Sequence, residues 1–226
     1  MLSSLFHLNN AYDVYEFLIR IPIVLFSLTV HEVAHGFAAY KLGDPTAKSL
    51  GRLSLNPLKH LDPAGAICML LFRFGWAKPV PINTRYFKKP RSGMALTALA
   101  GPASNLLMSL IAFIITRYIY AFGGAALLSD SVTFLQLLCI FFDTFFLMNL
   151  CLAVFNLIPV PPLDGSRILL VFLPDKLYFG IMRYEQYIYI GLIVCLFLGI
   201  LDVPLNFIVD LFLRLFYWLS GLLPLL

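Results

Sequence analysis

The strongest constraint on this chain of 226 residues is a series of apolar stretches, each long enough to cross a lipid bilayer. A helix of about 20 apolar residues spans the hydrocarbon core, and 61% of the residues are apolar whereas only 12% are charged. Backbone polar groups must be satisfied inside a bilayer, so such stretches are expected to be helical. We therefore predict an all-α polytopic membrane protein with about five to six transmembrane helices, forming one integral-membrane domain over residues 1–226.

The predicted spans fall into three long stretches, a shorter and only partly inserted segment, and two final stretches. Clusters of proline, glycine and charged residues separate them. The predicted ranges are 14–40, 92–120, 132–158, 166–182 for the partly inserted segment, 184–201 and 203–223.

The connection between the first two spans carries most of the positive charge. Ten of the sixteen basic residues lie between Lys41 and Arg91, against only Asp44 and Asp62. Cytoplasmic connections are enriched in lysine and arginine, which predicts that this one faces the cytoplasm. Such a stretch is typical of a solvated loop near anionic lipid headgroups, and we predict no nucleic-acid partner.

The same connection contains a segment that does not read as a helix. Residues 64–72 are apolar for only nine residues, too few to cross the bilayer. Aromatic and β-branched residues then alternate with turn formers from Phe74 to Ile82, as in a short edge strand or hairpin. We predict a re-entrant β element here, lining protein or a wet cavity.

The sequence His31-Glu32-Val33-Ala34-His35 lies inside the first span. Histidines four residues apart share one face of a helix, so both rings can bind one zinc ion about 2 Å away. Glu32 is placed to accept a proton from a water molecule on that metal. Burying polar side chains at this depth of the bilayer costs several kcal/mol unless a hydrogen-bond partner or a metal ion compensates. The alternative is a pair of neutral, hydrogen-bonded histidines beside a protonated Glu32.

A catalytic zinc ion usually has a third protein ligand, and His60 and Asp164 are the candidates. Asp164 is favoured because three prolines break the end of the preceding span, so irregular backbone can return its carboxylate to the metal. Gly165 permits a tight turn there. His60 lies in the basic connection, where an interfacial or structural role is expected.

Three asparagines and one aspartate are further polar residues of the predicted spans. Asn105 and Asn156 could donate hydrogen bonds to a developing oxyanion or to substrate backbone. The alternative for both is packing between helices, as we expect for Asn149. Asp143 could pair with an arginine, Arg20 or Arg117, or be protonated and hydrogen-bonded.

Taken together, three motifs resemble the site-2 protease family of intramembrane zinc metalloproteases. In chain order they are His31-Glu32-Val33-Ala34-His35, Gly101-Pro102-Ala103-Ser104-Asn105 and Asn156-Leu157-Ile158-Pro159-Val160-Pro161-Pro162-Leu163-Asp164-Gly165. The resemblance covers most of residues 14–167, and we expect a compact form without a PDZ or CBS domain.

The resemblance implies a zinc ion bound by His31, His35 and Asp164, with Glu32 as the general base. It also implies that Asn156 lies beside the active site and that a re-entrant β element joins the first two spans.

The implied activity is regulated intramembrane proteolysis, the hydrolysis of peptide bonds in or near transmembrane segments of membrane-protein substrates. The enzyme is expected in the cell membrane with its site nearer the cytoplasmic face, because His35 lies only about 9 Å along the helix from Lys41. Two alternatives remain: a prenyl-protein endopeptidase, against which the Asp164 context argues, and a non-proteolytic metal-binding, transport or scaffold protein.

Overall fold

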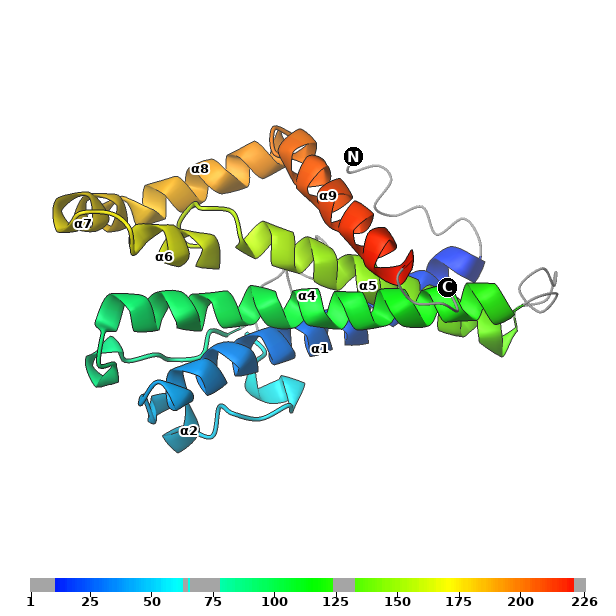
Figure 1. The fold of residues 1–226 in the computed structure, drawn as a ribbon, viewed down its shortest axis with the longest axis horizontal. Helices are drawn as coiled ribbons and strands as arrows, with labels where there is room; N and C mark the ends of the chain where they lie inside the picture. The colour runs from blue at the N-terminus through cyan, green and yellow to red at the C-terminus, as the bar shows by residue number, and fades with distance from the viewer. Residues whose placement is uncertain (1–10, 63–64, 66–77, 124–132, 222–226) are drawn as a thin grey trace.

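The computed structural model describes residues 11–62, 65, 78–123 and 133–221, and these are mostly helical (Figure 1). The helices are α1 (Ala11–Lys41), α2 (Thr46–Ser49), α4 (Pro90–Phe122), α5 (Phe134–Asn156), α6 (Asp164–Leu170), α7 (Asp175–Arg183), α8 (Glu185–Phe197) and α9 (Asp202–Gly221), with 3-10 turns η2 (Pro57–Lys59) and η3 (Thr84–Tyr86).

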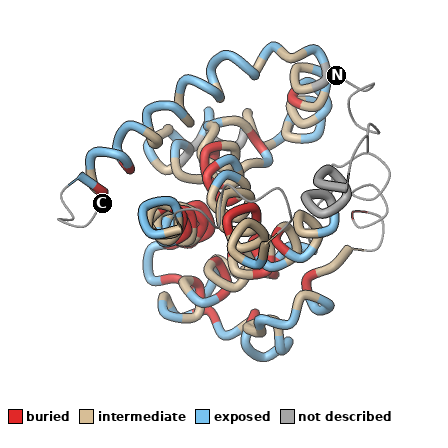
Figure 2. The backbone as a smooth tube through the Cα atoms, turned by 90° about the vertical axis from the view of Figure 1, so that its right-hand side faces the viewer, coloured by how far each residue is buried: buried red, intermediate tan, exposed pale blue. Residues whose placement is uncertain are grey.

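Three long helices, α1, α4 and α5, lie side by side and form the centre of the molecule, and α4 contacts both others (Figure 1). Small side chains make this approach possible. They recur at intervals of three or four residues on one buried face of α4, at Ala98, Gly101, Asn105, Ser109 and Ala112. Figure 2 shows the buried residues gathered where these helices meet, while the helix leading to the C-terminus is mostly exposed.

Within the described part of the chain, four helical segments are long and apolar enough to cross a membrane: Leu18–Lys41, Pro90–Phe122, Phe134–Asn156 and Asp202–Gly221. They confirm a mainly helical, multi-pass membrane protein. The predicted total of five to six spans is not confirmed. Helix α8 ends at Phe197 before the chain turns at Gly199, whose φ of 70° suits glycine, so its apolar length is shorter than a span. That the chain forms a single domain stays a prediction.

The predicted re-entrant β element is not confirmed either. Residues 66–77 lie outside the described part of the chain, and none of the described residues forms a regular strand. The stretch Lys78–Ile82 is extended but irregular, and Pro79 and Pro81 have no N–H to donate to a ladder.

This extended segment is nevertheless fixed in place beside α1. The Lys78 N–H donates to the His60 carbonyl at 2.8 Å, and Arg52 Nη2 donates to the Lys78 carbonyl at 2.7 Å. At its far end the Asn83 N–H donates to Asp44 Oδ2 at 2.6 Å. The segment therefore forms a stable wall along the end of α1.

The predicted segment 166–182 is divided into α6 and α7, which are separated by the stretch that contains Pro174. Before α6, the prolines after Asn156 end α5 and turn the chain back. The position that a Cβ would take at Gly165 is occupied by the Leu157 carbonyl, so only glycine fits this turn. The result is that α6 begins at Asp164, beside the last third of α1.

Candidate metal centre

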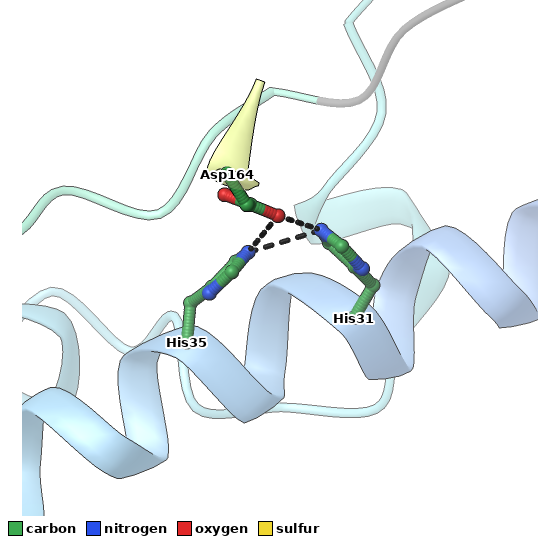
Figure 3. A group of neighbouring side chains, drawn as sticks. All are labelled: His31, His35 and Asp164. Carbon is green, nitrogen blue, oxygen red and sulfur yellow. Dashed lines mark hydrogen bonds and ion pairs between the residues drawn. The ribbon is translucent and has the colours of Figure 1, made fainter. Parts of the chain in front are cut away.

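Two imidazoles on α1 and one carboxylate on α6 converge on a common point (Figure 3). His31 and His35 are buried, and their Nε2 atoms lie 3.0 Å apart. The Asp164 Oδ2 atom lies 3.1 Å from Nε2 of His31 and 3.2 Å from Nε2 of His35. The structure thus brings together the three residues that the sequence proposed as ligands.

The hydrogen bond at Nδ1 of each ring determines whether Nε2 carries a proton or a lone pair. His35 Nδ1 lies 2.7 Å from the Thr97 carbonyl, which only accepts, so the ring proton is on Nδ1 and Nε2 carries a lone pair. His31 Nδ1 lies 2.9 Å from Asn105 Oδ1 and is placed in the same way. With the carboxylate, three lone-pair donors face one another.

This arrangement fits a zinc ion. Without a cation three lone pairs repel one another, and Asp164 Oδ2 is buried without a hydrogen-bond partner. The three ligand atoms lie within 4.8 Å of one another. A tetrahedral zinc ion with ligands at about 2.0 to 2.2 Å separates them by about 3.3 Å, close to the spacing found here. Two imidazole nitrogens and one carboxylate oxygen also leave the open position that a catalytic zinc needs.

Gly101 of α4 lies directly against the two rings. A Cβ at this position would stand 2.6 Å from Cε1 of His31 and 2.5 Å from Cε1 of His35. The glycine is therefore required for α4 to pass the two imidazoles at this distance.

Glu32, the predicted general base, lies in the same cleft as the ligands. The Val80 N–H donates to Glu32 Oε2 at 2.8 Å, so the extended segment holds this carboxylate. The cleft has a volume of about 390 Å³. Its walls come from α1, the extended segment, the beginning of α4 and the loop before α6.

The two predicted asparagines occupy different places. Asn156 lines the cleft and donates from Nδ2 to the Leu152 carbonyl at 2.9 Å. Asn105 is fully buried and contacts His31. That either side chain binds substrate or transition state stays a prediction.

The remaining sequence candidates lie outside the ligand group. His60 is buried and bonds through Nε2 to the Ser54 carbonyl at 2.8 Å, in line with the structural role expected. Asp143 accepts a hydrogen bond of 2.8 Å from the Tyr120 hydroxyl. Its pairing with an arginine stays a prediction.

The sequence analysis gave no role at the site to four groups: the Thr97 carbonyl, Val80, Asn149, which was expected only to pack between helices, and Arg167. Arg167 lines the cleft and forms an ion pair of 2.7 Å with Glu185. Its spacing of three residues from Asp164 on a helix could have revealed it. The partners of the other three depend on how distant segments pack, for which the sequence carries no signal.

Comparison with known proteins agrees with this geometry. A Bacillus subtilis (strain 168) protein with the provisional name zinc metalloprotease YwhC is 44% identical over 171 residues, 76% of each chain. A Mycolicibacterium smegmatis protein provisionally named zinc metalloprotease Rip2 is 30% identical over 155 residues, 66% of this chain and 55% of its own. Zinc metalloprotease MJ0392 of Methanocaldococcus jannaschii is 28% identical over 156 residues, 68% of this chain and 34% of its own.

No solved structure matches the chain with statistical significance. The family model described as peptidase family M50 matches residues 125–198, the part that contains Asp164. Because a relative 44% identical is matched over 76% of its length, the chain belongs to peptidase family M50, the site-2 protease family.

Proposed function

We propose that this protein is an intramembrane zinc metalloendopeptidase that cleaves peptide bonds in or near transmembrane segments of other membrane proteins. The observation that carries the proposal is the convergence of His31, His35 and Asp164 at 3.0 to 3.2 Å beside Glu32. We assign the first three as zinc ligands and Glu32 as the general base. The relatives' names and the family support zinc as the metal.

The residues of the cleft divide the chemistry between them. A zinc ion held by the three ligands supplies Lewis acidity, which lowers the pKa of a water molecule and polarises the substrate carbonyl. Glu32 accepts the proton of the attacking water and returns it to the leaving amine. The Val80 N–H holds the Glu32 carboxylate at the cleft during both transfers. Asn156, which also lines the cleft, would donate a hydrogen bond to the developing oxyanion.

A transmembrane substrate must unwind before its carbonyl can be attacked, because the carbonyl groups of a helix are bonded internally. The extended segment Lys78–Ile82 forms a wall of the cleft where an unwound segment would lie. Among the described backbone hydrogen bonds, none uses the Val80 or Pro81 carbonyl. These groups could accept from substrate N–H groups in the manner of strand addition.

The basic connection after α1 supports a site near the cytoplasmic face of the cell membrane. His35 lies six residues before Lys41, the end of α1, which is about 9 Å along a helix. Water then needs only a short path from the cytoplasm to the cleft. This orientation agrees with regulated intramembrane proteolysis at the cytoplasmic side.

The test compares wild type, Glu32→Gln and Asp164→Asn, purified in detergent, for zinc content and cleavage of a reporter transmembrane segment. We expect wild type to bind zinc and cleave, Glu32→Gln to bind zinc without cleaving, and Asp164→Asn to lose both. Cleavage by Glu32→Gln at the wild-type rate would refute the assignment. A metal carrier, the alternative considered from the sequence, would not need Glu32 for turnover.

A further inference from the structure

Two buried asparagines, one on α5 and one on α4, connect these helices to His31 of the proposed metal centre. Asn149 Nδ2 of α5 donates to the Phe145 carbonyl at 2.8 Å, and Asn105 Nδ2 of α4 donates to Asn149 Oδ1 at 3.3 Å. Asn105 Oδ1 in turn lies 2.9 Å from His31 Nδ1 of α1. Asn105 and Asn149 are 0% exposed, so water does not compete for these bonds.

The chemistry of each partner gives this chain of bonds one direction. The Phe145 carbonyl can only accept, so Asn149 presents its NH₂ group to it and its oxygen to Asn105. Asn105 must then present its own NH₂ group to Asn149 and its oxygen to His31. That oxygen cannot donate, so the His31 proton belongs on Nδ1 and the lone pair on Nε2. Reversing either amide would place like groups against each other in a buried site.

We propose that Asn149, acting through Asn105, is a positioning residue of the metal centre that fixes His31 with its Nε2 lone pair toward the ligand group. The consequence for metal binding rests on the zinc site proposed above. Outer partners of histidine ligands typically change metal affinity by about 10- to 100-fold. The Asn105–Asn149 pair thus does more than hold two helices together.

His35 and His31 have different hydrogen-bond partners, so His35 can serve as an internal control for changes at His31. His35 is held by the Thr97 carbonyl, a backbone group that side-chain replacements do not remove. His31 alone depends on the asparagine pair. Breaking the pair should therefore change the ring of His31 and leave the ring of His35 as it was.

The test uses Asn149→Leu, Asn105→Asp and the double variant. Asn149→Leu removes the acceptor that holds the Asn105 NH₂ group. Ser104 Oγ lies 3.5 Å from Asn105 Oδ1 but donates its proton to the Gly101 carbonyl at 2.7 Å, so the Asn105 amide can then turn its NH₂ group toward His31. A carboxylate has two acceptor oxygens and cannot present the wrong group, so adding Asn105→Asp to Asn149→Leu should restore the His31 proton to Nδ1. Pure helix packing predicts no such rescue.

Ser109→Ala is the matched control. Ser109 Oγ on α4 donates to the Phe146 carbonyl on α5 at 3.0 Å, and the residue is 0% exposed. Its loss removes a bond between the same two helices without touching His31.

The first readout is the ¹⁵N chemical shifts of the ring nitrogens of His31 and His35 in the metal-free protein, which report which nitrogen carries the ring proton. We expect Asn149→Leu to shift His31 toward Nε2–H, and the double variant and Ser109→Ala to keep the wild-type pattern. Unchanged His31 shifts in Asn149→Leu, or no rescue in the double variant, would overturn the proposal.

The second readout is zinc affinity by competition with a chelator. We expect the zinc affinity of Asn149→Leu to be about 10-fold lower than that of wild type. The double variant and Ser109→Ala should bind zinc with the wild-type affinity. If Asp164→Asn binds zinc as tightly as wild type, the proposed function is wrong. The chemical shifts of the ring nitrogens need no metal, so they would still test the positioning role of Asn149.

Discussion

Replacing Gly101 by alanine would place a methyl group against both imidazoles. The new carbon would stand 2.6 Å from Cε1 of His31 and 2.5 Å from Cε1 of His35, whereas carbon atoms in contact are about 3.5 to 4.0 Å apart. Either α4 or the rings must therefore move by about 1 Å. A metal site tolerates errors of only about 0.2 Å in its ligand distances, so the displacement exceeds the tolerance several-fold.

We expect Gly101→Ala to weaken zinc binding by more than about 100-fold, the upper range for losing an outer partner of a ligand. Cleavage of a reporter segment should fall by about 100-fold or more. Global stability should change less, because overpacking costs about 1 to 3 kcal/mol while alanine is favoured over glycine in a helix by about 1 kcal/mol. Zinc content after gel filtration, reporter cleavage and thermal unfolding measure the three quantities.

Gly191→Ala is the matched control. Gly191 is also within a helix, α8, but a Cβ there would meet nothing within 4 Å. This variant should keep wild-type zinc content and activity. Gly101→Ala with wild-type zinc affinity would refute the conclusion that α4 passes the ligands this closely.

Three further predictions concern the wall of the cleft and the metal. Val80→Pro removes the N–H that holds Glu32, so cleavage should fall by about 10- to 100-fold at unchanged zinc content. Val80→Ala keeps this N–H and should cleave at the wild-type rate. Equal cleavage rates in the two variants would contradict the role of this hydrogen bond. Burial raises the pKa of Asp44, but hydrogen bonds from Thr46 and Asn83 outweigh burial and hold that pKa below its ordinary value. The lowered pKa contributes stability that is present above about pH 4 and lost as the pH falls; thermal unfolding from pH 3 to 7 should show this loss in wild type and not in Asp44→Asn. Removing the metal with a chelator should abolish cleavage, and zinc should restore it; cleavage that persists in fully metal-free protein would exclude the proposed mechanism.

The parts of the site that the sequence predicted are those that follow from local geometry. His31 and His35 share a helix face because of their spacing, and the broken helix end at Asp164 marks a carboxylate that can leave its own span. Asn105 and Asn149 could not be assigned in this way, because their partners lie 74 and 44 residues away in the sequence. An amide donates and accepts equally well, so its role depends on the register in which helices pack.

The same distinction applies to the two parts of the fold prediction that are not confirmed, the number of spans and the β element. Apolar composition cannot tell a span from a shorter apolar helix, and the turn at Gly199 ends α8 early. Aromatic and β-branched residues suggested a strand around Val80, but the prolines on either side remove the donors that a ladder needs. In the described residues 78–82 the prolines therefore weigh against a regular strand, while residues 66–77 lie outside the described part of the chain.

The metal centre and the helix bundle support each other through separate connections to each ligand. His35 is held by backbone of α4, His31 by a side chain of α4, and Asp164 by the loop that returns from α5. The imidazoles therefore keep their partners whether or not a cation is bound. Asp164 Oδ2 has no hydrogen-bond partner, so the electrostatic cost of losing the cation falls mainly on this carboxylate. If the proposed ligands bind zinc, we expect the beginning of α6, which also carries the cleft residue Arg167, to be the part of the site whose position depends most on the metal.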